Sequence, residues 1–261
     1  MDFGLNGKTA LILGGGGGIG RAVATTLARE GVNVAVADMD QTALNRTVYE
    51  INGLCLQALP LVWDLSDLTE INNHVSSIEE HFGPVDILFN NTGGPPPTPA
   101  SGQEPSEWLK YFQAMVLSVI AITDRVLPGM KANKWGRIIT STSSGVIAPI
   151  PNLGLSNSLR MSLVGWSKTV AREVARDGIT ANIILPGRIG TDRIRFLDEQ
   201  KAKRENRTIE DVSSESTASI PIGRYGTPQE YANVVVFLAS SAASYLTGST
   251  IRVDGGYIAN V

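Results

Sequence analysis

The chain has 261 residues, 43% of them hydrophobic, and its 22 Lys and Arg side chains against 25 Asp and Glu give a net charge of −3. This composition supports a large core, and it excludes a chain that is disordered throughout or that carries a broad basic surface for nucleic acid. The single cysteine, Cys55, excludes an intramolecular disulfide. The first residues lack the basic and apolar regions of a secretion signal, and no apolar run approaches ~18 residues, so we expect a cytoplasmic chain without a membrane partner.

Short apolar runs and longer amphipathic stretches alternate along the chain, and we predict strands from the former and helices from the latter. In the first half, the order is strand Thr9–Leu13, helix Gly20–Arg29, strand Val32–Ala37, helix Gln41–Ile51, strand Leu54–Val62, helix Glu70–His81 and strand Val85–Asn90. In the second half, it is helix Ser106–Asn133, strand Arg137–Thr140, helix Leu155–Arg176, strand Ile179–Leu185, helix Thr227–Ala239 and strand Ser249–Val253. Joined by right-handed crossovers, these elements predict an α/β fold: one Rossmann-type domain over residues 1–261, with a doubly wound parallel sheet of about seven strands and helices on both faces.

Two segments interrupt this alternation. Gly93–Gly102 holds four prolines and three glycines and is a predicted loop directly after the fourth strand. Thr191–Ser219 is polar and mixes basic with acidic residues, and we interpret residues 191–219 as a mobile lid rather than as a second domain. Its basic side chains suit an anionic substrate, but the interspersed acids favour a solvated helical face.

A glycine-rich turn lies between the first predicted strand and the first predicted helix, with the sequence Gly14-Gly15-Gly16-Gly17-Gly18-Ile19-Gly20. Glycines let the backbone approach a pyrophosphate closely, and the amides and dipole of the following helix receive its charge. A turn without a ligand is the alternative. Two registers of the dinucleotide-binding motif fit: Gly15, Gly17 and Gly20, or Gly14, Gly18 and Gly20.

Asp38 ends the second predicted strand, at the ~20-residue offset expected of an acid that binds the adenosine ribose. A carboxylate there accepts hydrogen bonds from both ribose hydroxyls and repels a 2′-phosphate. No Arg or Lys precedes Ile19 in the turn, and Met39 and Asp40 follow Asp38. We therefore predict NAD(H) as the cofactor, with NADP(H) less favoured; the alternative is that Asp38 simply caps the next helix.

Further short segments follow the other predicted strands: Asp64-Leu65, Asn90-Asn91-Thr92-Gly93, Pro186-Gly187-Arg188-Ile189-Gly190-Thr191, Gly223–Glu230 and Thr247–Gly256. Together with the glycine-rich turn, they resemble the short-chain dehydrogenase/reductase family, in particular its 3-oxoacyl-carrier-protein reductase-like members, over nearly the whole chain. The resemblance implies an NAD(P)-dependent oxidoreductase that interconverts an alcohol and a carbonyl in a small molecule. The cofactor-binding residues that it implies are Gly14, Gly17, Gly18, Ile19, Gly20, Asp38, Asp64, Leu65, Asn91, Thr92, Gly93, Arg160, Pro186, Gly187, Ile189 and Thr191.

The catalytic residues depart from the Asn, Ser, Tyr and Lys that the family uses. Counted without gaps from family-like segments on both sides, the serine position falls on Ser143, the tyrosine on Ser156 and the lysine on Arg160. The asparagine position falls on Met115, which we expect to be a packing residue. No tyrosine occurs between residues 112 and 224, so a shift of one residue does not restore the motif. The chain resembles a divergent branch that lacks the catalytic Tyr and Lys.

In the family, the tyrosine exchanges a proton with the substrate, the serine holds the substrate oxygen, and the lysine lowers the tyrosine pKa and binds the ribose. A serine hydroxyl is far less acidic than a phenol with a pKa near ~10, so Ser156 is a poor general acid without help. Arg160 keeps its charge and can contact a ribose or a carboxylate with two donors, with a structural ion pair as the alternative. Ser143 either anchors the substrate oxygen or is a strand-end serine satisfied by backbone.

Three functions stay open. The first is the NAD(H)-linked oxidoreductase, with its proton supplied through water or through a group that the sequence does not identify. The second is a nucleotide-binding protein without redox turnover, a sensor or an oligomer partner, and the third is a structural subunit that binds no cofactor. The resemblance implies a homodimer or homotetramer that pairs the helices at Ser106–Asn133 and Leu155–Arg176. We predict no metal site, because His74 and His81 lack carboxylate partners in register.

Overall fold

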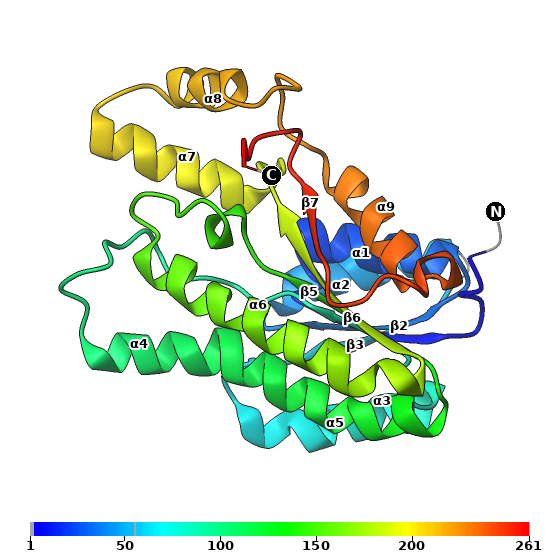
Figure 1. Cartoon of the computed structure of the whole chain (residues 1–261). Helices are drawn as coiled ribbons and strands as arrows, with labels where there is room; N and C mark the ends of the chain where they lie inside the picture. The colour runs from blue at the N-terminus through cyan, green and yellow to red at the C-terminus, as the bar shows by residue number, and fades with distance from the viewer. Residues whose placement is uncertain (1–2, 55, 261) are drawn as a thin grey trace.

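The computed structural model describes residues 3–54 and 56–260, and within them a sheet of seven strands runs in the order β3-β2-β1-β4-β5-β6-β7 (Figure 1). All neighbouring strands are parallel. The direction of winding reverses between β1 and β4, which confirms the predicted doubly wound α/β fold. The strands are β1 (Thr9–Leu13), β2 (Asn33–Asp38), β3 (Ala58–Val62), β4 (Ile87–Asn90), β5 (Gly136–Ser141), β6 (Ile179–Pro186) and β7 (Thr250–Val253).

Two apolar clusters lie on opposite faces of the sheet, and each is covered by helices. Every residue of β1 and β5 is buried, as expected for parallel strands that are covered on both faces. This packing aligns the carboxyl ends of all the parallel strands along one side of the sheet, across the strand direction. The covering helices are α1 (Gly18–Arg29), α2 (Gln41–Asn52) and α9 (Pro228–Ala239) on one face, and α3 (Ile71–Phe82), α5 (Ser118–Ala132) and α6 (Gly154–Val174) on the other.

The long helix predicted at Ser106–Asn133 is one continuous helical run with an irregular turn inside it. It consists of α4 (Pro105–Phe112), a π-helical turn at Gln113–Leu117, and α5. Met115 lies in the π-helical turn and is buried in an apolar cluster between this run and α6. Its role as a packing residue is therefore confirmed.

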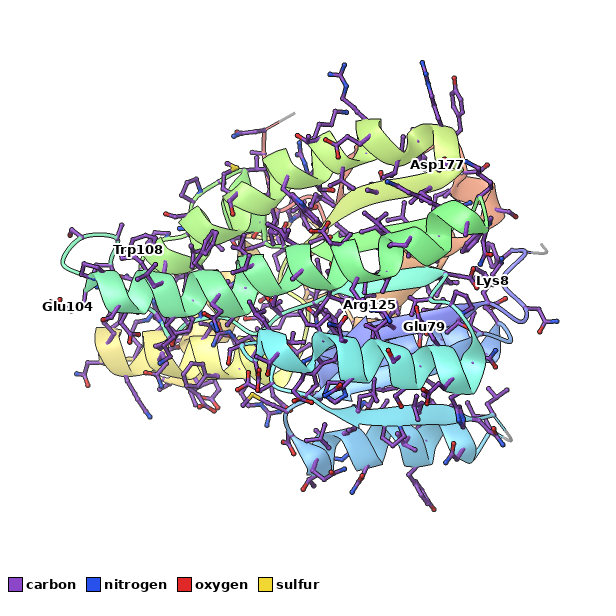
Figure 2. All side chains as sticks on the ribbon, turned by 90° about the horizontal axis from the view of Figure 1, so that it is seen from below. Lys8, Glu79, Glu104, Trp108, Arg125 and Asp177 are labelled. Atoms are coloured by element: carbon purple, nitrogen blue, oxygen red, sulfur yellow. The ribbon has the colours of Figure 1, made fainter. Side chains whose placement is uncertain are left out.

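The same run bears on the expectation that no segment spans a membrane. By length and composition alone, Pro105–Ala132 is long and apolar enough to cross one, and 39% of its most apolar window is buried inside the fold. A helix that packs in the core of a domain passes the same test. Half-buried between the two helices, Arg125 of α5 donates two hydrogen bonds to Glu79 of α3, of 3.0 and 2.7 Å, and so holds the two helices together (Figure 2).

The third strand is shorter than predicted. It begins at Ala58 instead of Leu54, and it forms one edge of the sheet. Pro60 and Val62 are exposed there, so the apolar character of this segment does not reflect burial on both faces. Cys55, which the prediction places in this strand, lies outside the described residues.

The segment predicted as a lid forms two helices, α7 (Asp192–Glu205) and α8 (Ile209–Ala218). Figure 1 shows both helices beyond the edge at which β6 ends. Glu215 of α8 accepts a hydrogen bond of 2.9 Å from Lys201 of α7, and it also pairs with Arg207. The expected charged helical faces are confirmed, whereas movement of this segment stays a prediction.

Candidate functional site

The glycine-rich turn between β1 and α1 needs glycine at particular positions. Gly14 and Gly18 have φ of +61° and +33°, values that side chains rarely allow. A Cβ at Gly20 would lie 2.0 Å from the carbonyl oxygen of Gly14, whereas a Cβ at Gly17 would meet no heavy atom within 4 Å. Of the two predicted registers, the geometry therefore favours the one formed by Gly14, Gly18 and Gly20.

Changing Gly20 to Ala is expected to lower the free energy of unfolding by about 3 kcal/mol, because the new methyl group meets backbone that has no room to move. Denaturant unfolding of the cofactor-free chain measures this effect. The matched control is Gly17→Ala, at an extended position with φ −123° and open space, where we expect a change below about 0.5 kcal/mol. Equal unfolding midpoints for the two variants would contradict the close packing described above.

The N-terminus of α1 has open donors. Its N-cap, Gly17, makes no side-chain capping bond, and no acidic residue lies in the first turn of the helix. The first backbone N–H groups of such a helix have no intrahelical acceptor and favour an anion. The turn and the helix end therefore fit a pyrophosphate group.

Asp38 links the end of β2 to the glycine-rich turn. Its Oδ2 accepts a hydrogen bond of 2.9 Å from the backbone N–H of Gly16, and its Oδ1 accepts one of 3.0 Å from Asp40 N–H. Asp40 is the residue that caps α2, by accepting from the backbone of Thr42 and Ala43. The alternative in which Asp38 caps that helix is therefore wrong. Each carboxylate oxygen has a second lone pair for another donor, such as a ribose hydroxyl.

Two further segments meet the glycine-rich turn at the same edge. Asn91, directly after β4, lies against Gly14, where a Cβ would stand 2.8 Å from Asn91 Nδ2. Thr191, the N-cap of α7, places its methyl carbon 2.8 Å from the position of a Cβ at Gly18. The turn after β1, the loop after β4 and the start of the lid are therefore neighbours.

The remaining cofactor residues from the sequence lie at the ends of other strands. Asp64 is exposed two residues after β3, where its Oδ1 accepts from the backbone and hydroxyl of Ser66, and Leu65 is half-buried beside it. Pro186 ends β6, and the Gly187 N–H donates to the carbonyl of Val253 in β7. Ile189 is buried. All of these residues follow the carboxyl ends of strands, where ligands bind in open α/β sheets.

Of the three predicted catalytic residues, one lies just after β5 and two lie on α6. Ser143 follows β5 and its Oγ accepts a hydrogen bond of 3.0 Å from Gly145 N–H, which leaves its own proton free to donate. Ser156 is buried near the start of α6, and its hydroxyl has no hydrogen-bond partner among the described residues. Arg160 is one turn further on the same face of α6.

Arg160 joins α6 to the loop after β4. Its Nη2 donates to the carbonyl oxygens of Thr92 at 3.1 Å and Gly93 at 2.7 Å. No carboxylate of the described residues pairs with it, so the alternative of a structural ion pair is wrong. Burial, and then the nearby charge of Arg193, lower the pKa of Arg160 to about 10, so it stays charged at neutral pH.

Two lid contacts are absent from the sequence prediction. Arg193 of α7 donates from Nη2 to the carbonyl of Pro95 at 2.8 Å, in the loop that follows β4. The buried carboxylate of Asp198 in α7 accepts from Arg188 at 3.0 Å and from the Tyr225 hydroxyl at 2.7 Å. These bonds connect α7 to the loop after β4 through Pro95 and to the segments at Arg188 and Tyr225. The sequence shows that residues 191–219 are rich in basic side chains, but it does not show which groups these side chains contact.

One buried tyrosine packs against the sheet on the face opposite α6. Tyr231 of α9 is fully buried on the face that α1 covers, with its oxygen 2.9 Å from Ser141 Oγ. Burial raises its pKa, which makes it a weak proton donor.

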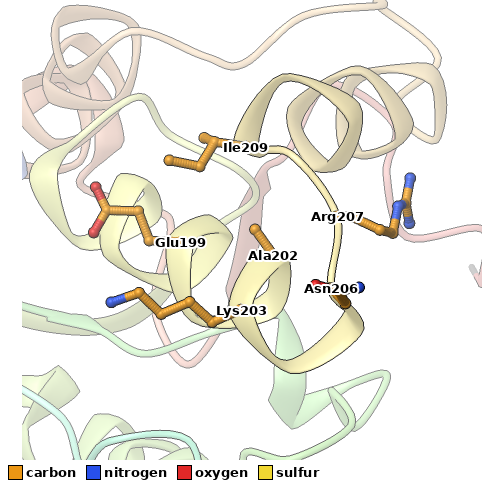
Figure 3. Close-up of a pocket in the computed structure, with 6 residues that line it drawn as sticks. All are labelled: Glu199, Ala202, Lys203, Asn206, Arg207 and Ile209. Atoms are coloured by element: carbon orange, nitrogen blue, oxygen red, sulfur yellow. The ribbon is translucent and has the colours of Figure 1, made fainter.

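A pocket of about 310 Å³ opens at the turn between α7 and α8 (Figure 3). No predicted cofactor or catalytic residue lines it, so it belongs to the lid itself. Its lining residues are Glu199, Ala202, Lys203, Asn206, Arg207 and Ile209.

Comparisons with known proteins agree with this arrangement. A family profile described as Enoyl-(Acyl carrier protein) reductase matches residues 15–258. The 3-oxoacyl-(acyl-carrier-protein) reductase FabG of Salmonella typhimurium is 37% identical over 260 residues, which cover 98% of each chain.

Two solved structures are similar to this chain over almost its full length. The L-sorbose reductase of Gluconobacter frateurii, complexed with NADPH and L-sorbose, has a TM-score of 0.94 and 29% identity and covers 100% of both chains. An NAD⁺-bound xylitol dehydrogenase has a TM-score of 0.90 and 27% identity, and covers 97% of this chain and 99% of its own. The chain therefore belongs to the short-chain dehydrogenase/reductase family of oxidoreductases.

Proposed function

We propose that this protein is an NAD(H)-preferring oxidoreductase that interconverts an alcohol and a carbonyl with a degenerate catalytic tetrad. One observation carries the proposal: the glycine-rich turn, Asp38, and the face of α6 with Ser156 and Arg160 all adjoin the carboxyl ends of the strands. A dinucleotide at this edge has phosphate donors at one end and polar side chains at the other. When bound, the nicotinamide cofactor supplies the hydride chemistry.

Asp38 supports the choice of NAD(H). Its carboxylate is held by two backbone N–H groups and has lone pairs left for the ribose hydroxyls, while a 2′-phosphate beside it would be repelled. No Arg or Lys in residues 14–18 or 39–40 would compensate that phosphate. The similar solved structures include several that hold or depend on NADPH and a xylitol dehydrogenase bound to NAD⁺, so we expect cofactor choice to depend on local residues such as Asp38.

The residues proposed to hold the cofactor are those of the glycine-rich turn and the strand ends. Gly14, Gly17, Gly18, Ile19 and Gly20 would face the pyrophosphate. The other proposed contacts are Asp38, Asp64, Leu65, Asn91, Thr92, Gly93, Arg160, Pro186, Gly187, Ile189 and Thr191.

At the reacting end, we assign separate tasks to three side chains. Ser143 donates its hydroxyl proton to the substrate oxygen, because that proton has no acceptor among the described residues while one lone pair of Oγ accepts from Gly145 N–H. Arg160 supplies positive charge that stabilises a developing negative oxygen. Ser156 stands where the family has tyrosine, and Met115 stands where it has asparagine. A buried methionine positions no water, so the proton reaches the substrate by another route, through Ser156 and solvent or through the substrate itself.

Several sequence predictions remain part of this proposal. They are a single domain with a lid at residues 191–219, a cytoplasmic location, and a homodimer or homotetramer. Exposed apolar side chains on the two long helices support self-association, since burial of such a patch favours binding. These side chains are Leu109, Phe112, Leu117 and Met161.

A protein that binds the nucleotide without turnover is the second candidate. It is favoured by Ser156, whose hydroxyl has no hydrogen-bond partner within residues 3–54 and 56–260 that would raise its acidity, and by Arg160, whose Nη2 donates to two backbone carbonyls.

A panel of ketones and aldehydes, assayed by the absorbance of NADH, tests the proposal directly. We expect turnover with at least one carbonyl class and a slower rate with NADPH. Binding of NADH with no turnover across a broad panel would support the second candidate instead.

A further inference from the structure

Gly94 lies beside two guanidinium groups, those of Arg160 and Arg193. A Cβ built on Gly94 would be 3.5 Å from Nη2 of Arg160 and 3.7 Å from Nη2 of Arg193, and apart from its two chain neighbours no other described residue would have a heavy atom within 4 Å. These distances place the two nitrogens within about 7 Å of each other, a gap that one carboxylate spans when both its oxygens accept bonds of about 2.8 Å. The two guanidinium groups are therefore close enough for one carboxylate to contact both.

The charges of these two groups are not balanced by the protein. No carboxylate of the described residues is within ion-pair distance of Arg160 or Arg193. Arg160 is buried, and burying a charge without a partner is costly. The repulsion between the two cations adds to this cost and contributes to the lowered pKa of Arg160.

Both guanidinium groups keep unused donors. Arg160 uses only Nη2, toward Thr92 and Gly93, and Arg193 uses only Nη2, toward Pro95. Their Nε and Nη1 groups have no acceptor among the described residues. Backbone carbonyls hold the two side chains in place, while most of their donors remain for a ligand.

We propose that Arg160 and Arg193 bind a carboxylate of the substrate, which makes the substrate a keto acid or the corresponding hydroxy acid. This inference rests on the proposed oxidoreductase function. A carboxylate suits the site better than a phosphate, because the prolines at 95–97 have no N–H groups to satisfy further oxygens. The proposed phosphate contacts of the cofactor are with the turn after β1, not with this loop after β4.

The position of the site relative to the catalytic residues limits the substrate further. Arg160 is four residues, a rise of ~6 Å, beyond Ser156 on the same face of α6. We therefore expect the carboxylate to lie near the reacting carbonyl, as it does in a short keto acid. Arg193 reaches the anion from the lid, so binding of an acid also connects α7 to α6.

Three substitutions at Gly94 test the site without relying on turnover. The backbone of Gly94 is outside the left-handed region and the two nearest contacts are of ordinary length, so a side chain fits. Gly94→Asp places a carboxylate of the chain itself between the arginines. Gly94→Asn has the same shape without the charge, and Gly94→Ala controls for the loss of glycine.

The measurement is the Tm of the cofactor-free protein with and without acetate or propionate, against chloride at equal ionic strength. We expect Gly94→Asp to melt about 2–4 °C above Gly94→Asn, because its carboxylate neutralises the two cations. Acetate and propionate should raise the Tm of the unchanged protein, but not those of Gly94→Asp and Gly94→Asn, whose side chains occupy the position of the ligand. Equal Tm values for the Asp and Asn variants, with no effect of carboxylates on the unchanged protein, would overturn the proposal.

The anion site and the oxidoreductase function are tested by separate outcomes. If carboxylates raise the Tm but the carbonyl panel gives no turnover, the anion site stands and the oxidoreductase proposal fails. If neutral ketones are reduced and keto acids have no advantage, the oxidoreductase proposal stands and the anion site fails. Once a keto acid that the protein reduces has been found, Arg193→Gln should raise the KM for that keto acid at least ~10-fold and leave the KM for NADH unchanged.

Discussion

Replacing Asp38 with alanine is expected to raise the Kd for NAD(H) about 100-fold, while the Kd for NADP(H) changes by only a few-fold. Hydrogen bonds from ribose hydroxyls to a carboxylate are charge-assisted, and removal of such a partner costs about 1.5–3 kcal/mol. The 2′-phosphate loses a repulsive neighbour at the same time, which offsets part of the damage for NADP(H). Calorimetric titration with each of the two cofactors measures the change.

Asp38 also holds the glycine-rich turn through Gly16 N–H, so the loss of ribose contacts has to be separated from loosening of the turn. Asp38→Asn keeps an acceptor for that N–H but removes the charge. Asp40→Asn is the matched control, because it removes a carboxylate two residues away and keeps an acceptor for the cap of α2. A loss of NAD(H) affinity as large in Asp40→Asn as in Asp38→Ala would show that Asp38 has no specific role.

Placing a phenol at position 156, where we propose that the chain lacks a general acid, is expected to have an effect of similar size. The double variant Ser156→Tyr, Arg160→Lys should reduce generic ketones at least ~10²-fold faster than the unchanged protein, since a positioned general acid contributes ~10²–10⁴ in rate. A phenol next to a cation donates a proton far more readily than a serine hydroxyl does. Initial rates of NADH oxidation at saturating NADH measure the gain.

A second double variant, Ser156→Phe with Arg160→Lys, separates the phenol from the added bulk. It fills nearly the same volume but lacks the hydroxyl, so it should show no gain. Equal rates for the Tyr and Phe variants would show that Ser156 is not at the proton-donating position. A fall in activity on a keto acid, alongside a gain on neutral ketones, is expected if Arg160 binds the carboxylate.

Where burial leaves a clear pattern, the sequence was enough to predict the fold. The strand at Thr9–Leu13 was predicted with its observed bounds, because a strand covered on both faces is a continuous apolar run and a glycine ends it. The third strand was overextended toward Leu54, because an edge strand is only partly covered and its apolar residues do not mark its ends. The first helix begins at Gly18, two residues before the predicted start, because glycines give no capping signal.

The starts of the two lid helices could have been predicted from their capping residues. Thr191 and Thr208 each cap a helix by accepting from the backbone three residues later, a pattern that is visible in the sequence. The convergence of Arg160 and Arg193 on Gly94 was not predictable in this way. It depends on how α7 packs against the loop after β4, and Arg193 and Pro95 are 98 residues apart in the chain.

The most direct test of the proposed cofactor site is a calorimetric titration of the unchanged protein with NAD⁺ and NADH. We expect saturable binding of one dinucleotide per chain, with a Kd below the millimolar range and weaker binding of NADP⁺ and NADPH. Absence of binding at millimolar NAD⁺ and NADH would contradict the proposed cofactor site and every chemical role built on it.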